Sequence, residues 1–136
     1  WDLERLRQRS RKTHPNVDFL GFNDDVGAEL HNADLLLHLC PEEPFGLAIL
    51  EAMAVGLPVL VPSSGGAGSL VESGRTGFHF QANDADSLAM QLEKLSAQPS
   101  ESLERVGAGG RAQLHSRFSA VARAADYGRL LTEKLV

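Results

Sequence analysis

Short apolar runs alternate with segments of helical periodicity along the first half of the chain. Residues 34–39 and 57–61 are continuous apolar runs of strand length, and residues 44–55 between them are a helix candidate. Residues 16–21 alternate between polar and apolar and end at a glycine, which predicts a short strand that finishes in a turn. Residues 77–80 predict a further strand at the edge of a sheet. Strand and helix therefore follow each other in turn.

Acidic and polar residues mark the starts of further helices. Asp24 and Asp25 precede a segment with apolar residues at helical spacing, and Asn83 or Asp84 caps a helix with a leucine every three or four residues. Residues 65–68 are rich in glycine and are predicted to form a loop. The remaining predicted helical segments are residues 1–12, a short turn at 69–73, residues 100–113 weakened by three glycines, and a stretch from Ser119 to the terminus.

This order of elements predicts an α/β fold. Strands that are apolar on both faces and separated by helices indicate a parallel sheet covered on each side, with right-handed crossovers. We therefore expect a Rossmann-like sheet with helices on both faces, in a chain that ends in helices. The first helix has no capping residue before it, so we interpret residues 1–136 as a single partial domain whose beginning is missing, which leaves a sheet edge uncovered.

Composition excludes several classes of function. The formal net charge is −5 and the Lys and Arg residues are scattered, so no nucleic-acid partner is expected. The apolar runs are too short for a transmembrane segment. The single cysteine cannot form an internal disulfide, and the metal-site spacings CxxC and HExxH do not occur. We expect no metal ligands and a reducing, cytoplasmic setting. Cys40 is expected to be a small buried apolar residue, and His38 to lie in the core or in a pocket wall.

The carboxyl ends of two buried strands point to a ligand site, because ligands of open parallel sheets bind beyond these ends. There, Pro44 suits the first position of a helix, so Glu43 is expected at the N-cap. The amides of residues 45–48 are then expected to have no hydrogen-bond partners. Free amides and the helix dipole favour a phosphate. Glu51 lies about two turns further on, so both carboxylates are expected along one side of the helix. Taken alone, two such glutamates are more often a cap and a solvated face, and the glycines an ordinary loop.

A longer string of residues resembles a known family. Residues 43–54 read EPFGLAILEAMA, and GLPVL at residues 56–60 and the pair Gly65-Gly66 follow. This string is similar to the E-x7-E signature of retaining GT-B glycosyltransferases of the glycogen-synthase and mannosyltransferase type, known as group 1. The resemblance implies that the chain is the C-terminal half of such an enzyme, the half that binds a nucleotide diphosphate sugar.

The resemblance also implies roles for individual residues. Glu43, as the catalytic residue, would hold hydroxyls of the donor sugar, and Glu51 the ribose hydroxyls, a task that suits an ionised carboxylate. The other implied donor contacts are the amides of Phe45 and Gly46 to the sugar, the amides of Leu47 and Ala48 to the diphosphate, and Gly65 and Gly66 lining the sugar pocket. The pattern departs from the family at Gly68-Ser69, where members carry Pro-Glu, so the next helix start is expected to be altered.

The rest of the enzyme is implied to lie upstream of Trp1. By the same resemblance the upstream part contains an Arg and a Lys that neutralise the diphosphate, and a domain for a sugar, lipid or glycan acceptor, through which peripheral membrane contact would occur. No cofactor and no metal are implied, and the fragment alone is expected to be inactive. Two alternatives remain open: a non-catalytic module that binds nucleotide sugars, and a nucleotide-sugar epimerase of the same fold. A plain receiver-like domain would need an acidic cluster or phosphate loop after its first strand, and neither occurs.

Overall fold

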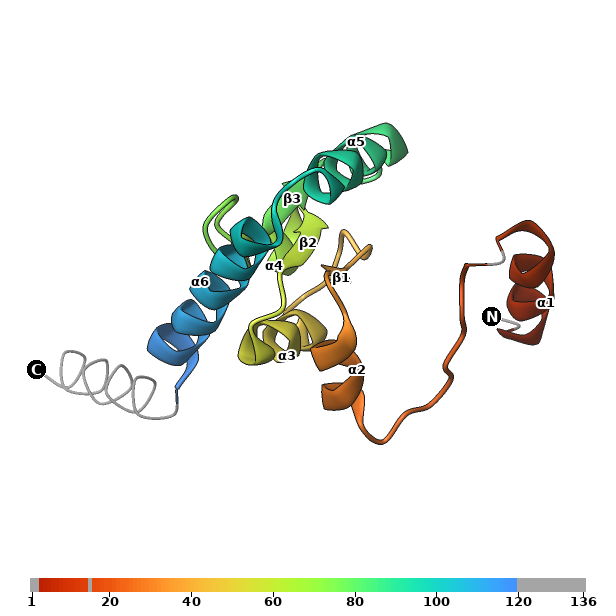
Figure 1. The fold of residues 1–136 in the computed structure, drawn as a ribbon, viewed down its shortest axis with the longest axis horizontal. Coiled ribbons are helices and arrows are strands. Elements are labelled where there is room, and N and C mark those ends of the chain that lie inside the picture. Colours follow the sequence, from red (N-terminus) through yellow and green to blue (C-terminus); the bar gives the residue numbers. More distant parts are fainter. Residues whose placement is uncertain (1–2, 15, 120–136) are drawn as a thin grey trace, which may run out of the picture.

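The protein is built around a small parallel sheet (Figure 1). The computed structural model describes residues 3–14 and 16–119. Within them the strands are β1 (Leu36–Leu37), β2 (Val59–Pro62) and β3 (Phe78–Phe80), in the order β1-β2-β3. The helices are α1 (Leu3–Thr13), α2 (Val26–Asn32), α3 (Leu47–Val55), α4 (Gly65–Leu70), α5 (Ala85–Ser96) and α6 (Ser100–Phe118). The parallel α/β class predicted from the sequence is confirmed.

The central strand β2 is buried on both faces because its side chains alternate between two clusters. Val59 and Val61 pack with Ile49 of α3, whereas Leu60 packs with Phe78 and with side chains of α5 and α6. Val59, Leu60 and Val61 are fully buried, and burial of each of these aliphatic side chains is worth about 1.5–3 kcal/mol. Helices therefore cover both faces of the sheet, as the apolar runs predicted.

Helix α6 is longer than predicted, and its glycines explain why. A Cβ atom at Gly107 would collide with the carbonyl of Gly56, and one at Gly109 would collide with the carbonyl of Arg75. These glycines let α6 lie directly on the backbone of its neighbours, so the close packing offsets their poor helix propensity. The helix continues to Phe118, five residues beyond its predicted end.

The strand predicted at residues 16–21 is wrong. These residues form an irregular extended segment between α1 and α2 (Figure 1), and Leu20 is 65% and Phe22 92% exposed nearby. A strand needs a hydrogen-bonded neighbour, and within the described residues none pairs with this segment. The first helix, the helix after Asp24 and Asp25, and the cap at Asp84 are confirmed, and Asp25 also caps the helix that it precedes. The helix predicted after Ser119 lies outside the described residues.

Candidate functional site

The loop from His38 to Gly46 connects the end of β1 to the start of α3. The His38 amide donates to the carbonyl of Leu60 at 3.0 Å, which extends the pairing of β1 with β2 by one residue. Gly46 has a φ of 79°, in the left-handed region that glycine adopts at little cost, and is the N-cap of α3. The predicted placement of Glu43 at the N-cap and Pro44 in the first turn is therefore wrong. The helix begins three residues later because the left-handed Gly46 sets its start.

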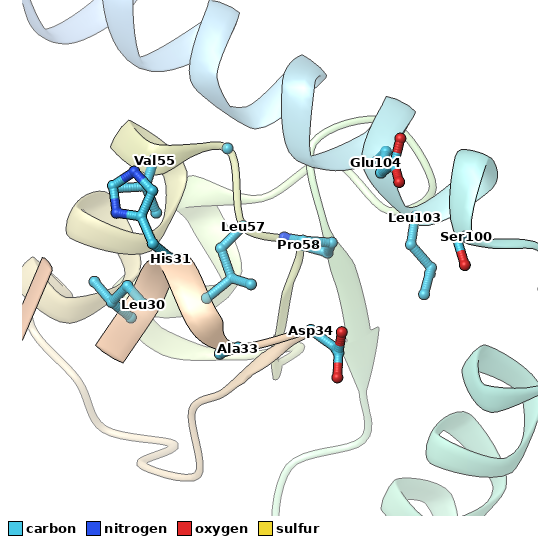
Figure 2. Close-up of a pocket in the computed structure, with 11 residues that line it drawn as sticks. Leu30, His31, Ala33, Asp34, Val55, Leu57, Pro58, Ser100, Leu103 and Glu104 are labelled. Carbon is cyan, nitrogen blue, oxygen red and sulfur yellow. The ribbon is translucent and has the colours of Figure 1, made fainter. Parts of the chain in front are cut away.

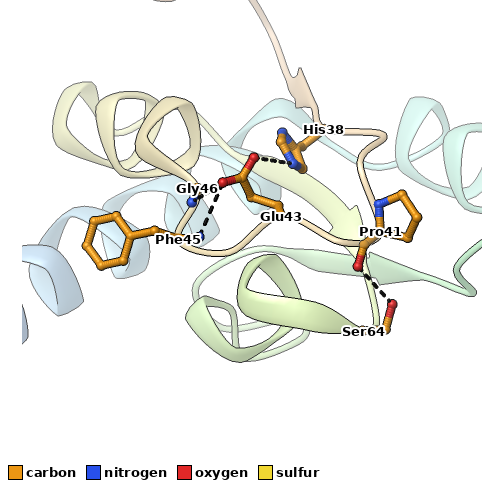
Figure 3. A network of polar contacts seen from close by, with 6 residues as sticks. All are labelled: His38, Pro41, Glu43, Phe45, Gly46 and Ser64. Carbon is orange, nitrogen blue, oxygen red and sulfur yellow. Dashed lines mark hydrogen bonds and ion pairs between the residues drawn. The ribbon is translucent and has the colours of Figure 1, made fainter.

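Glu43 nevertheless reaches the start of this helix with its side chain (Figure 3). Its Oε1 accepts hydrogen bonds from the amides of Gly46 at 2.9 Å and Phe45 at 3.2 Å, and its Oε2 lies 3.8 Å from Nε2 of His38. The hydrogen bond from Gly46, then that from Phe45, lower the pKa of Glu43; desolvation opposes them, and nearby His38 contributes least to the lowering. Glu43 is therefore an ionised carboxylate with one oxygen committed to the backbone.

Two amides at the start of α3 remain available to a ligand. The amides of Ile49 and Leu50 both donate to the carbonyl of Gly46, which closes the first turn. Leu47 and Ala48 are the first two helical residues and are exposed, and their amides have no acceptor among the described residues. The four free amides expected at residues 45–48 are therefore two, because Glu43 occupies the others.

The glycines after β2 begin a helix and do not form the predicted loop. Gly65 and Gly66 open α4 and press against the loop that carries Glu43. A Cβ atom on Gly65 would come within 2.5 Å of the carbonyl oxygen of Pro41, and one on Gly66 within 2.6 Å of that of Glu43. The Gly66 amide also donates to the Glu43 carbonyl at 2.9 Å. The absence of side chains at these positions is what brings α4 against the Glu43 loop.

Ser69 is the next-to-last residue of α4. Its hydroxyl is exposed and donates to the carbonyl of Gly66 at 2.7 Å, within the same helix. The change from Pro-Glu to Gly68-Ser69 therefore leaves a continuous helix, and Gly68 packs closely on the backbone of Ser63.

Glu51 is exposed and lies in the second turn of α3. It borders a hollow of about 370 Å³ that the start of α2 also lines, with Asp25, Val26 and Ala54 among its walls. The prediction that both glutamates lie along one side of the same helix is therefore wrong. Glu43 lies in the preceding loop and faces His38, whereas Glu51 faces the groove between α2 and α3.

A second cavity, of about 280 Å³, lies at the opposite end of the sheet (Figure 2). Its walls include Asp34, which precedes β1, Pro58, which precedes β2, and Glu104 of α6. Ligands of parallel sheets bind beyond the carboxyl ends of the strands, and this cavity is at the amino ends. The loop that carries Glu43, at the carboxyl ends of the strands, is therefore the candidate ligand site.

The sequence interpretation missed the environment of Cys40. The cysteine is exposed, so its predicted burial as a small apolar residue is wrong. It follows His38 by two positions, and the ligand atoms of His38, Cys40 and Glu43 all lie within 4.8 Å of one another. His38 is half-buried in this loop, and its predicted role in the core or in a pocket wall stays a prediction. The spacing of two and three residues directly after a strand is the signal that could have revealed the group.

Comparison with known proteins gives the family. Residues 2–113 match the family described as Glycosyl transferases group 1. The chain is 32% identical over 120 residues to the N-acetyl-alpha-D-glucosaminyl L-malate synthase of Bacillus anthracis, covering 88% of this chain and 28% of that protein. It is 35% identical over 102 residues to the glycogen synthase of Mycobacterium tuberculosis, covering 74% and 24%. The chain thus spans about a quarter of the length of these relatives.

Solved structures share the fold. The Anabaena protein HepE in complex with UDP-glucose aligns with a TM-score of 0.81 and 28% identity, over 96% of this chain and 36% of HepE. The sucrose-phosphate synthase of Thermosynechococcus elongatus aligns with a TM-score of 0.82 and 26% identity, over 97% and 34%. No helix in the described residues combines the length and the apolar content needed to cross a bilayer. From the family match over residues 2–113, the chain belongs to the group 1 glycosyl transferases.

Proposed function

We propose that this chain is the donor-binding part of an enzyme that transfers a sugar from a nucleotide diphosphate sugar to an acceptor, with retention of anomeric configuration. The observation that carries the proposal is the start of α3, where the free Oε2 of Glu43 lies in the loop leading to the unpaired amides of Leu47 and Ala48. A sugar and a phosphate are the two ligand chemistries that such groups suit. HepE, with the same fold, has been crystallised with UDP-glucose.

The proposed donor lies along the beginning of α3. The diphosphate accepts hydrogen bonds from the amides of Leu47 and Ala48, where the helix dipole also favours negative charge. Glu43 accepts hydrogen bonds from sugar hydroxyls through Oε2. Glu51 accepts them from the ribose hydroxyls, in the groove between α2 and α3 that its carboxylate borders.

The proposed chemistry relies on stabilising the departing diphosphate. When the bond between the anomeric carbon and the phosphate oxygen breaks, negative charge grows on the leaving group, and amides already aimed at it need no reorganisation. We assign the remaining neutralisation to basic residues outside this chain, and we assign no cofactor, no required metal and no general base to the described residues. Glu43 acts by orienting the sugar for attack.

The ribose assignment is tested by Glu51→Ala in the full-length protein. Loss of a hydrogen bond to a charged group costs about 1.5–3 kcal/mol, which corresponds to a roughly 10- to 150-fold weaker affinity. Calorimetry should show this loss for both the free nucleotide and the nucleotide sugar, because both contain ribose. Glu93→Ala, at an exposed position of α5, is the matched control and should leave both affinities unchanged. Unchanged affinity of Glu51→Ala for the free nucleotide rejects the assignment.

Transfer itself is tested with the full-length protein, nucleotide sugars and a panel of acceptors. The expected product is a new glycoside with the anomeric configuration of the donor, identified by NMR. An inverted product rejects retention. Release of an altered free sugar without an acceptor identifies an epimerase, and donor binding without turnover identifies a non-catalytic module.

A further inference from the structure

Three different metal-binding side chains converge at the end of β1. His38, Cys40 and Glu43, here called the loop triad, offer an imidazole nitrogen, a thiol and a carboxylate oxygen, all within 4.8 Å of one another. Nε2 of His38 is buried and has no hydrogen-bond partner among the described residues. Its distance of 3.8 Å to Oε2 of Glu43 is too long for a hydrogen bond. A bound ion or an ordered water molecule is among the partners that such a buried nitrogen can have.

The geometry and the donor atoms suit zinc. Bond lengths of about 2.0–2.3 Å and tetrahedral angles place the ligand atoms of Zn²⁺ roughly 3.3–3.6 Å apart. The distance from His38 to Glu43 is already 3.8 Å, and Cys40 is exposed, so side-chain rotation brings the third ligand into range. Nitrogen, sulfur and oxygen ligands in a tetrahedral arrangement favour Zn²⁺ over Mg²⁺ and Ca²⁺, which prefer oxygen.

We propose that the loop triad binds Zn²⁺ and that this binding blocks the sugar end of the donor site. Cys40 binds as the thiolate and releases its proton to solvent, His38 binds through the lone pair of Nε2, and Glu43 binds through Oε2. Water occupies the fourth position. The blocking step rests on the proposed function, because it removes the one Glu43 oxygen left free for a sugar hydroxyl. The ion is an inhibitor in this proposal and takes no part in transfer.

The inhibition should be selective between ligands. Glu51 and the amides of Leu47 and Ala48 are not ligands of the ion, so Zn²⁺ should weaken binding of the nucleotide sugar more than binding of the free nucleotide. Zn²⁺ also binds diphosphates in solution, and Cys40→Ser corrects for this effect because it removes a protein ligand and leaves the donor unchanged. Neither Cys40 nor His38 is assigned a role in transfer.

The site is tested on the full-length protein with Co²⁺ as a spectroscopic substitute for Zn²⁺. A thiolate ligand in a tetrahedral site produces an intense sulfur-to-cobalt absorption band, which excess Zn²⁺ should abolish. Cys40→Ser and His38→Asn should remove the band or weaken metal affinity at least about tenfold, as expected when a metal site loses a supporting group. His31→Asn, an exposed histidine on α2, is the matched control and should retain the band.

The inhibition is tested separately by titrating Zn²⁺ into the transfer assay. The concentration for half inhibition should rise at least about tenfold in Cys40→Ser. Absence of a band that depends on Cys40 and His38 overturns the site, even if the protein is an active transferase. A band without transfer by the metal-free protein supports the site and contradicts the proposed function. Equal inhibition of the wild type and Cys40→Ser overturns the blocking role.

Discussion

The two oxygens of Glu43 have different surroundings, and this difference determines what the residue can do. Oε1 accepts both backbone hydrogen bonds, from Phe45 and Gly46, and so holds the loop in shape. Oε2 lies 3.8 Å from Nε2 of His38, which is beyond hydrogen-bonding distance. Structural and ligand-binding roles therefore reside on separate atoms of one side chain, and a substitution that keeps the first atom can test the second.

The substitution Glu43→Gln is that test. Gln retains an oxygen for the two backbone amides but replaces the other oxygen with a nitrogen donor. In the full-length protein we expect affinity for the free nucleotide to stay almost unchanged, while kcat/KM falls by roughly ten- to a hundredfold because the sugar is less well oriented. Calorimetry with both ligands and steady-state kinetics measure the two effects.

The exposed neighbour Glu42 provides a control for this change. Glu42→Gln alters charge by the same amount one residue away and should leave binding, kinetics and melting temperature unaffected. If Glu43→Gln instead weakens binding of the free nucleotide and of the nucleotide sugar equally, Glu43 has only a structural role.

The lowered pKa of Glu43 predicts how stability depends on acid. The unfolded chain binds the proton at the ordinary glutamate pKa of about 4.5, whereas the folded chain binds it only at lower pH. The stabilisation by Glu43 is therefore fully present above that value and is lost as pH falls through the folded pKa. Melting temperatures of the wild type and Glu43→Gln should differ near neutral pH and converge on acidification. A difference that does not vary with pH contradicts this assignment.

At the scale of elements, the start of α4 supports the loop that leads to α3. Gly66 donates to the carbonyl of Glu43 and lies so close to Pro44 that no side chain fits between them. The hydroxyl of Ser64 adds a long contact of 3.4 Å to the carbonyl of Pro41 (Figure 3). The position of Glu43 therefore depends on α4 as well as on its own loop.

Gly66→Ala tests this dependence. Its Cβ atom would collide with the carbonyls of Pro44 and Glu43, and such overpacking costs about 1–3 kcal/mol. The melting temperature should fall, and affinity for the nucleotide sugar should fall because the Glu43 loop is displaced. Gly27→Ala is the control for stability alone, because it borders the groove assigned to the ribose; its Cβ atom meets only ordinary contact at 3.5 Å and alanine favours a helix. Unaltered stability and donor affinity in Gly66→Ala would show that α4 does not position the loop.

The sequence predicted elements well where the signal was local. The helix after Asp24 and Asp25, the Asp84 cap and the apolar run of β2 were correct because acidic helix starts, side-chain capping and burial on both faces leave a direct pattern. The start of α3 was misplaced because the left-handed backbone of Gly46 overrides the preference of Pro44 for a first turn. The glycines at 65 and 66 were misread as a loop because their close packing on a distant loop leaves no local signal.

The site was predictable to the same extent. Glu43 lies beside the start of α3, as expected from strand order and from the resemblance to the family, whereas its hydrogen bonds, the groove beside Glu51 and the loop triad depend on how loops fold back in space. The assigned contacts of Glu43 and Glu51 with a donor stay predictions until the binding measurements above are made.

At the scale of the whole molecule, the chain corresponds to a minor part of the relatives that it matches. It covers 28% of the N-acetyl-alpha-D-glucosaminyl L-malate synthase of Bacillus anthracis and 36% of HepE. The glutamates assigned to the donor are both negatively charged, so the described site offers a diphosphate only amides and the helix dipole in compensation. Transfer is therefore expected to require groups from the rest of the protein.

We expect residues 1–136 alone to fold, or nearly so, but to transfer no sugar. Circular dichroism and a thermal melt should show helical structure, because the β2 core is buried on both faces. A transfer assay with the purified chain should give no product under conditions in which the full-length protein is active. Measurable turnover by the isolated chain contradicts this prediction and places the whole catalytic centre within these residues.

The close approach of Gly66 to the Glu43 loop has a consequence for how such a site diversifies during evolution. The loop meets α4 through main-chain carbonyls, and every amino acid has a carbonyl at that position. The side chains of Pro41 and Pro44, whose carbonyls make these contacts, can therefore be replaced without adding an atom between the loop and α4. Gly65 and Gly66 have no such freedom, because any replacement adds an atom where there is no room. At this contact, substitutions are therefore expected to accumulate in the loop and to be rare at the two glycines.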